Sequence, residues 1–151
     1  MMWRALAAFL ALPGVVAFAV PLAVALAERR AQRLQLLGLM PVVFGALLLL
    51  WCVREFYVAG RGTLAPWDPP RQLVTTGPYR YSRNPMYTGV AILLGGWAIL
   101  FWSRTLAIYA SAVVIGFHLR IVLAEEPWAA RKFGGAWEAY RSHVPRWLVR
   151  G

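Results

Sequence analysis

Long apolar stretches separated by short polar segments dominate this sequence. Four of them can be delimited, over residues 3–27, 34–58, 84–102 and 105–125. A run of about 20 apolar residues is long enough to cross the hydrocarbon core of a bilayer as a helix. The pattern therefore predicts an all-α fold, an integral membrane helical bundle with about four transmembrane helices.

Prolines and glycines inside these runs refine the prediction. Proline bends a helix because it removes a backbone donor, so bends are expected in the first two runs, at Pro13, Pro21 and Pro41. Two pairs of glycines are spaced seven residues apart: Gly38 with Gly45, and Gly89 with Gly96. Each pair shares one helix face, which either lets another helix approach closely or is merely tolerated.

The remaining segments predict loops and a polar tail. Residues 60–83 contain several prolines and form the long non-helical connection, whereas Ser103 is expected to cap a tight turn. The fourth helix is expected to end near Glu125, to resume past Pro127 and to stop at residues 134–135. A short helix over residues 136–143 follows, so the C-terminal part is predicted to be a cytoplasmic amphipathic helical tail.

The composition agrees with a membrane protein. Hydrophobic residues make up 60% of the 151 residues and charged residues 15%, which is less charge than a soluble domain carries. The net charge of +10 comes from arginines between the apolar runs. That placement is typical of topology signals and lipid headgroup contacts rather than of nucleic-acid binding. Cys52 is the single cysteine, which excludes an intrachain disulfide.

The distribution of arginines predicts an orientation. With four spans, the N-terminus, the long loop and the C-terminal tail share one side, and that side carries most of the arginines. The positive-inside rule places this side, with both termini, in the cytoplasm. We therefore expect an integral protein of a bacterial-type inner membrane, with membrane lipids as partners and no obligate protein partner.

A first polar cluster, residues 77–89, ends where the third run begins. Asn84 is a favoured N-cap and Pro85 a favoured first helical residue. The positive end of that helix lies beside Tyr79 and Arg83, and it suits an anionic group such as a carboxylate or phosphate.

A second cluster contains Glu125 and Glu126, which point about 100° apart on a helix and so have different tasks. One suits a cationic or hydroxyl-bearing ligand while the other pairs with an arginine. Equally, both can be solvated or paired with basic neighbours. No metal site is predicted, because two carboxylates alone bind a metal poorly. His118 lies seven residues before Glu125 and is therefore expected on the same face of the helix. It is either a functional group or a hydrogen-bonded residue of helix packing.

Three ordered motifs resemble a known family. Residues 82–89, SRNPMYTG, resemble the R-H-P-x-Y-x-G motif of the isoprenylcysteine carboxyl methyltransferases, which belong with the phospholipid N-methyltransferases. Glu125 and Glu126 resemble the paired glutamates of that family, and residues 133–147 resemble its F-G…V-P-R tail. One departure is that Asn84 replaces the histidine of the family. Asn cannot shuttle a proton near neutral pH, whereas His can.

The resemblance implies a cytoplasm-facing S-adenosylmethionine pocket and a lipophilic acceptor that enters from the bilayer. We expect one domain, with an N-terminal helical hairpin (1–59), a cytoplasmic loop (60–84) and a cofactor-binding half (85–151). The residues expected at the cofactor are Tyr79, Arg83, Asn84, Pro85, Tyr87, Glu125, Glu126 and Tyr140. The tail, with Arg141 and Arg146, is expected to close over them.

Which residues are expected to be catalytic depends on the chemical group that accepts the methyl group. A carboxylate acceptor needs an arginine to position it and no base, and Arg141 and Arg146 are expected in that role. An amine acceptor needs a base, for which Glu126 is the candidate. The predicted function is S-adenosylmethionine-dependent methyl transfer to the carboxylate of an isoprenylcysteine-like compound. The alternatives are a phospholipid amine N-methyltransferase, an NADPH-dependent enzyme similar to sterol reductases, and a non-enzymatic membrane scaffold.

Overall fold

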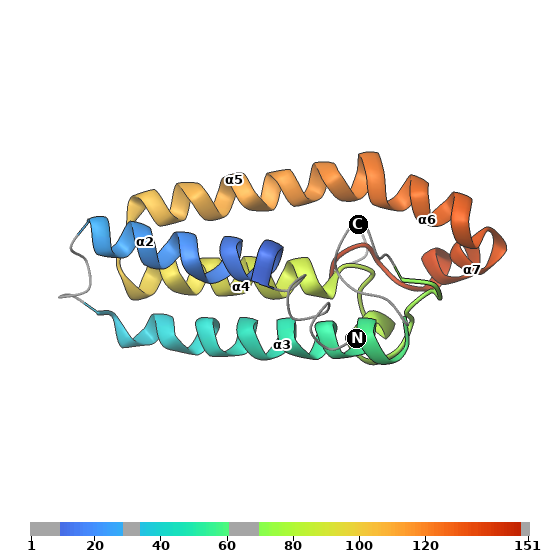
Figure 1. The fold of residues 1–151 in the computed structure, drawn as a ribbon, viewed down its shortest axis with the longest axis horizontal. Helices are drawn as coiled ribbons and strands as arrows, with labels where there is room; N and C mark the ends of the chain where they lie inside the picture. The colour runs from blue at the N-terminus through green and yellow to red at the C-terminus, as the bar shows by residue number, and fades with distance from the viewer. Residues whose placement is uncertain (1–9, 29–33, 61–69, 149–151) are drawn as a thin grey trace.

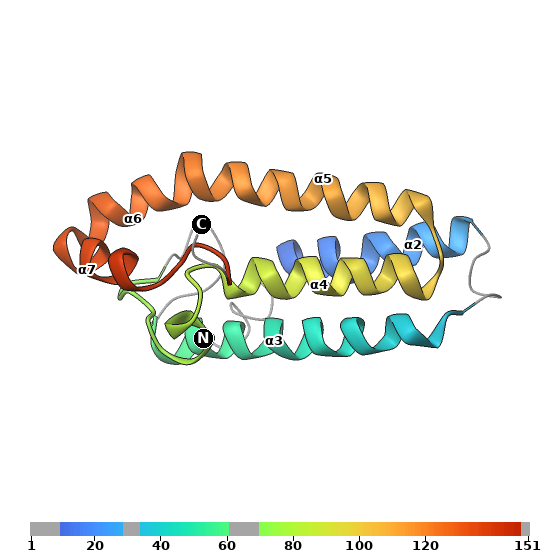
Figure 2. The ribbon, with the colours of Figure 1, turned by 180° about the vertical axis from the view of Figure 1, so that it is seen from behind.

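The computed structural model describes residues 10–28, 34–60 and 70–148, and every regular element in them is helical. The long helices lie side by side along one axis, and α4 lies between α3 and α5 in both opposite views (Figures 1 and 2). The elements are η1 (Leu10–Ala19), α2 (Val20–Ala27), η3 (Leu36–Gly38), α3 (Leu39–Val58), η4 (Gly77–Arg80), α4 (Pro85–Leu100), α5 (Arg104–Arg120), η5 (Ile121–Glu125), α6 (Glu126–Phe133) and α7 (Gly135–His143). The all-helical prediction is therefore confirmed for the described residues.

Glycines let α3 and α4 pack backbone against backbone. A Cβ atom on Gly45 would lie 2.6 Å from the carbonyl oxygen of Gly89. A Cβ atom on Gly96 would lie 2.6 Å from the backbone nitrogen of Val42. Separations this short leave no room for a side chain, so the close-approach interpretation of the glycine pairs is confirmed.

The first apolar run forms the π-helical segment η1, which contains Pro13, followed by α2 with Pro21 near its start. Side chains of other helices bond the carbonyl groups of η1. Trp97 Nε1 donates to the Ala17 carbonyl at 2.9 Å, and the Tyr109 hydroxyl donates to the Val16 carbonyl at 3.0 Å. These contacts fix the segment against α4 and α5. Residues 3–9 of the run lie outside the described residues.

The fourth apolar run differs from its prediction. The prediction of a helix break near Glu125 and Pro127 is wrong, because α5, η5 and α6 form one continuous helix over Arg104–Phe133. The Glu126 N–H donates to the Ile121 carbonyl, five residues back, so η5 is a π-helical turn. Such a turn changes the hydrogen-bond pattern just before Pro127 and lets the helix continue past it. The start agrees, since the Ser103 side chain accepts from the Leu106 N–H at 3.2 Å.

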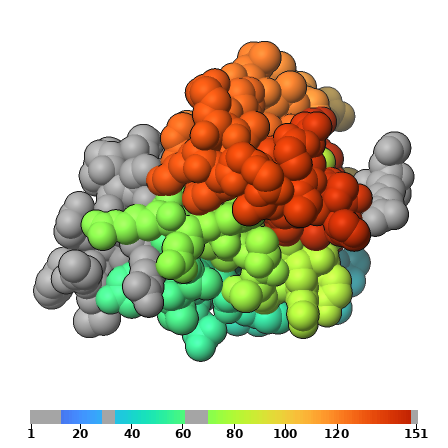
Figure 3. All heavy atoms as spheres, turned by 90° about the vertical axis from the view of Figure 1, so that its right-hand side faces the viewer, coloured from blue at the N-terminus to red at the C-terminus, as the bar shows by residue number. Residues whose placement is uncertain are grey.

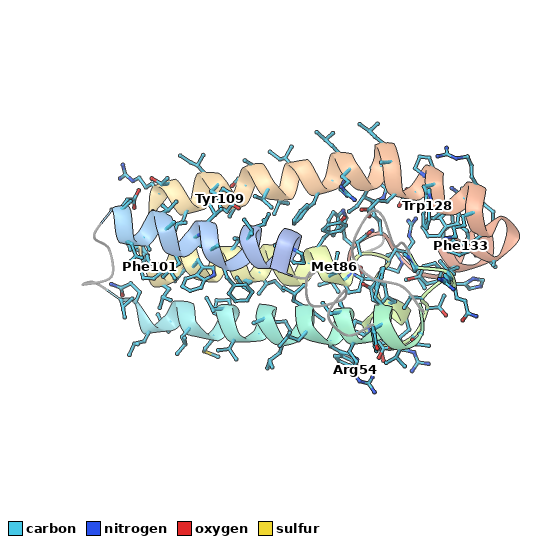
Figure 4. All side chains as sticks on the ribbon, in the orientation of Figure 1. Arg54, Met86, Phe101, Tyr109, Trp128 and Phe133 are labelled. Atoms are coloured by element: carbon cyan, nitrogen blue, oxygen red, sulfur yellow. The ribbon has the colours of Figure 1, made fainter. Side chains whose placement is uncertain are left out.

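Two helical stretches are long and apolar enough to cross a membrane, Leu36–Val58 and Arg104–Phe133. The apolar helices Pro13–Ala27 and Pro85–Leu100 are shorter. Large apolar side chains on α3 and α5 are exposed, including Met40, Phe44, Leu47, Leu50, Ile108, Ile115 and Leu119, and sticks project outward from both helices in Figure 4. The described residues thus account for two of the four expected spans.

Candidate active site

A cavity of about 380 Å³ lies at one end of the bundle. Its walls come from residues 70–79, the start of α4, the end of α5 with η5, and the two short helices α6 and α7. Figure 3 shows this end of the molecule, with α6 and α7 above the chain that leads into α4. Figure 4 places Met86 at the start of α4 and Trp128 and Phe133 on α6, all at this end.

A buried carboxylate on α3 anchors the loop under the cavity. The Thr76 hydroxyl donates to Glu55 Oε2 at 2.6 Å. Gly77 has a φ of 56°, and a Cβ there would lie 2.8 Å from Glu55 Cγ, so only glycine fits this turn. Sequence reasoning missed Glu55, although an acidic residue within an apolar run is a signal in itself.

Tyr79 and Tyr140 join this loop to the C-terminal tail. Tyr79 is buried against Cys52, and its hydroxyl makes no hydrogen bond of normal geometry within the described residues. The Tyr140 hydroxyl donates to the Tyr79 carbonyl at 2.6 Å. Burial raises the pKa of both phenols, so Tyr140 remains a neutral donor at physiological pH. Both residues line the cavity.

Both carboxylate oxygens of Glu126 accept hydrogen bonds from arginines. Arg83 Nη1 donates to Glu126 Oε1 at 2.8 Å. Arg146 binds the same carboxylate with Nε at 2.9 Å and Nη2 at 2.8 Å, a bidentate pair. The hydrogen bond with Glu126 raises the pKa of Arg146, whereas burial lowers the pKa of Arg83. The Arg83 guanidinium also lies 5.7 Å from the centre of the Trp137 ring.

The backbone of the tail is held by the same loop. The Arg83 N–H donates to the Pro145 carbonyl at 2.9 Å. The Asn84 side-chain amide donates to the Arg146 carbonyl at 3.0 Å, and the Ser82 hydroxyl donates to it at 3.3 Å. Asn84 stands at the N-cap position of α4, but its side chain makes no cap bond there. The predicted N-cap role is thus wrong for its side chain, which holds the tail instead.

The hydrogen bonds of Glu125 differ from those of Glu126. Its Oε1 accepts hydrogen bonds from the Tyr87 hydroxyl and, at 2.7 Å, from Arg120 Nε. Its Oε2 has no hydrogen bond within the described part of the chain. Glu125 lines the cavity, so this carboxylate has lone pairs to offer a ligand.

Lys132 connects α6 to the loop beside the cavity. Its ammonium donates to the Pro70 carbonyl at 2.8 Å and lies 4.7 Å from the centre of the Trp128 ring. Trp128 and Phe133 pack edge to face, with ring centres 5.7 Å apart. α6 therefore presents an aromatic wall that is tied to the loop on the opposite side.

The sequence profile described as phospholipid methyltransferase matches residues 34–136, more than half of the chain. The chain belongs to the phospholipid methyltransferase family. The predicted resemblance is thereby confirmed at the level of the family.

One curated relative of this family member is the Protein-S-isoprenylcysteine O-methyltransferase of Schizosaccharomyces pombe, which is 34% identical over 73 residues. The match covers 48% of this chain but only 31% of the relative, so the chain spans less than a third of that protein's length. No solved structure matches the chain significantly.

The structure of this phospholipid methyltransferase family member brings most of the predicted site residues together. Those that line the cavity are Tyr79, Arg83, Asn84, Tyr87, Glu125, Glu126 and Tyr140. Pro85 is buried at the first position of α4 and supports the site without lining it. Arg141 lies outside the cavity and pairs with Glu138 on the surface of α7. Arg120 lines the cavity but was missed, because an arginine near a helix end is usually interpreted as snorkelling.

His118 does not face this site. Its side chain is exposed, and its ring stacks on Trp147 with the centres 6.2 Å apart. The expectation that it shares a face with Glu125 is wrong, because the π-helical turn η5 lies between them. Seven residues no longer make two turns when the helix contains a wider turn.

Proposed function

We propose that this protein is an S-adenosylmethionine-dependent methyltransferase that acts on a lipophilic acceptor. Membership of the phospholipid methyltransferase family supports methyl transfer. The observation that carries the proposal is a cavity lined by two unlike carboxylates: Glu125 has one oxygen without a hydrogen bond among the described residues, whereas arginines bind both oxygens of Glu126.

The lining residues fit the proposed donor. The free oxygen of Glu125 suits an ammonium group or ribose hydroxyls, and Arg83 with the N-terminus of α4 suits a carboxylate. The aromatic wall of Trp128 and Phe133 offers a surface on which a flat purine can stack. When bound there, S-adenosylmethionine supplies a methyl group whose carbon–sulfur bond breaks with the electron pair left on sulfur.

We propose a carboxylate as the acceptor, since the relative from Schizosaccharomyces pombe is named as an isoprenylcysteine O-methyltransferase. A carboxylate attacks without losing a proton, so the protein needs only to align it and exclude water. That requirement agrees with a site whose second glutamate is held as an ion-pair partner and is not free to act as a base.

A phospholipid amine is the second candidate, favoured by the description of the family. An amine must lose a proton, and Glu125 would then be the base, because both oxygens of Glu126 accept hydrogen bonds from arginines. We also propose that the cavity faces the cytoplasm and that residues 85–151 supply most of the cofactor site, with the loop before them completing it.

Calorimetric titration of the purified protein in detergent tests the proposal. S-Adenosylhomocysteine should bind in the micromolar range, and NADPH should not. Glu125→Gln should weaken the binding at least about tenfold, because an ion pair or charge-assisted hydrogen bond is lost. Glu138→Gln, a change of an exposed glutamate outside the cavity, is the matched control.

Each other outcome has a distinct meaning. Binding of NADPH alone would move the protein to a reductase-like function. Binding of neither compound to folded protein would favour the membrane scaffold. Normal binding of S-adenosylhomocysteine to Glu125→Gln would contradict the assignment of that residue.

A further inference from the structure

A second, smaller cavity adjoins the candidate active site. It has a volume of about 110 Å³ and lies between η1, α4 and α5. Four of its lining residues are apolar and belong to it alone: Pro13, Val16, Val90 and Phe117. Three residues line both cavities, and we call them the junction: Met86, Tyr87 and Arg120. A ligand in the small cavity therefore meets the active site at the junction.

Arg120 is the charged residue of the junction. Its Nε donates to Glu125 Oε1 at 2.7 Å, and its side chain is 52% exposed. Its guanidinium also hydrogen bonds to the Tyr87 hydroxyl, and its remaining Nη donors have no hydrogen bond within the described part of the chain. An arginine held at Nε with free Nη donors can bind a carboxylate through parallel hydrogen bonds.

The other arginines near the site are committed elsewhere. Arg146 uses Nε and Nη2 on Glu126. Arg83 uses Nη1 on the same carboxylate, and its buried Nε has no hydrogen-bond partner among the residues that the structure describes. Arg141 pairs with Glu138 outside the cavity. The two arginines that the sequence suggested for an acceptor carboxylate are thus engaged by glutamates, whereas Arg120 lines both cavities and keeps Nη donors for that role.

We propose that Arg120 positions the carboxylate of the methyl acceptor at the junction, with the aliphatic part of the acceptor in the small cavity. This inference rests on the proposed function and names the residue that selects the acceptor class. The apolar walls suit a hydrocarbon segment, and the guanidinium repels an ammonium group. Glu125 Oε1 already accepts from Arg120 and Tyr87. The proposed function assigns Glu125 Oε2 to the cofactor, so with the cofactor bound Glu125 offers an amine acceptor little compensation.

The test compares two probes that differ only in charge. One is an N-acylated S-prenylcysteine with a free carboxylate, and the other is its primary amide. Each is titrated into the full-length protein in detergent with saturating S-adenosylhomocysteine. We expect the wild type to bind the acid at least about tenfold more tightly than the amide. In Arg120→Gln this preference for the acid over the amide should disappear.

Two further variants make the result specific. Arg120→Lys keeps the charge but loses the planar pair of donors, so part of the preference for the acid should remain. Arg104→Gln removes another exposed cation, at the opposite end of α5, and should keep the full preference of the wild type. If Arg120→Gln does not fold, a reduced preference in Arg120→Lys supports the proposal and an unchanged preference overturns it.

Other outcomes would overturn the inference. An unchanged preference for the acid in folded Arg120→Gln excludes the role of Arg120. A preference lost in Arg83→Gln but kept in Arg120→Gln assigns the acceptor to Arg83. An equal loss of affinity for both probes and for S-adenosylhomocysteine shows that Arg120 acts only through Glu125. Failure of the wild type to bind S-adenosylhomocysteine, measured first, contradicts the proposed function instead.

Discussion

Glu125 and Glu126 are adjacent in the chain, yet the structure gives them separate tasks. Glu126 accepts three hydrogen bonds from two arginines that lie 43 residues before it and 20 residues after it. Glu125 has one oxygen without a hydrogen bond in the described part of the chain, and we propose that this oxygen binds the ligand. The sequence predicts that the two carboxylates differ, but it does not say which arginine each one meets, because those partners are brought together only by the fold.

The ion pair between Arg146 and Glu126 is expected to stabilise the folded tail. Arg146→Ala should lower the free energy of unfolding by about 1–3 kcal/mol, since two charge-assisted hydrogen bonds to a mostly buried carboxylate are lost. Thermal or chemical unfolding in detergent measures this loss. Arg141→Ala breaks an exposed pair with Glu138 and should cost less than about 0.5 kcal/mol. Equal effects of the two variants would contradict a stabilising role for the ion pair between Arg146 and Glu126.

The buried hydroxyl of Tyr140 leads to a prediction about the stability of the protein at high pH. Burial raises its pKa in the folded protein above the usual value of 10.0. The unfolded chain therefore loses this proton first, so stability is full below pH 10 and falls as the pH rises beyond it. Tyr140→Phe should lose about 1 kcal/mol at neutral pH, through its hydrogen bond to Tyr79, and should show a shallower decline above pH 10.

The measurement is a series of unfolding curves between pH 7 and about 12, a window set by that shift. Tyr81→Phe is the control, because Tyr81 is 67% exposed and lies outside the cavity. A decline above pH 10 that is as steep in Tyr140→Phe as in the wild type would rule out this contribution of Tyr140.

Packing of α3 against α4 depends on glycines, and two adjacent positions allow a sharp comparison. A Cβ on Gly96 would clash with the backbone of α3, whereas a Cβ on Gly95 would meet nothing within 4 Å. Gly96→Ala should therefore destabilise the protein by about 1–3 kcal/mol through overpacking. Gly95→Ala should be neutral or stabilising by up to about 1 kcal/mol, because alanine favours a helix. Similar melting temperatures for both variants would refute this packing.

Helix positions and helix details differ in how far they can be predicted. The apolar runs place α3, α4 and α5 within a few residues, because burial in an apolar environment needs long uninterrupted hydrophobic segments. The glycine spacing predicts which faces meet. The π-helical turn η5 is different, since Pro127 signals a disturbance but not its kind. That turn changes the angle between His118 and Glu125, and His118 lies outside the cavity wall and stacks on Trp147.

The residues of the candidate site can be predicted only in part from the sequence. Local motifs identify Arg83, Tyr87 and Glu125, because their spacing along one helix or turn fixes their surroundings. Contacts between distant segments are not encoded in such spacing. The hydrogen bonds of Arg146 to Glu126 and the place of Arg120 between two cavities follow from how α5 and the tail fold onto α4.

The bundle has two ends with different charge and chemistry, and this leads to a prediction about orientation. The cavity, the loop and the tail gather at one end, and Trp102 lies at the other, beyond the far end of α4 (Figure 1). We expect the cavity end to face the cytoplasm, since exposed arginines such as Arg80 lie there. Cys52 is buried, so cysteines introduced at the surface can be labelled selectively.

Arg80→Cys and Trp102→Cys, each combined with Cys52→Ala, test this orientation. A membrane-impermeant maleimide should label Trp102→Cys in intact cells, because Trp102 is 71% exposed at the far end. It should label Arg80→Cys only after the membrane is opened, because a charged reagent does not cross the hydrocarbon core. The reverse pattern would show that the protein has the opposite orientation in the membrane. Labelling of both variants in intact cells would show that both ends lie outside the cell. Either result would contradict a cytoplasmic active site.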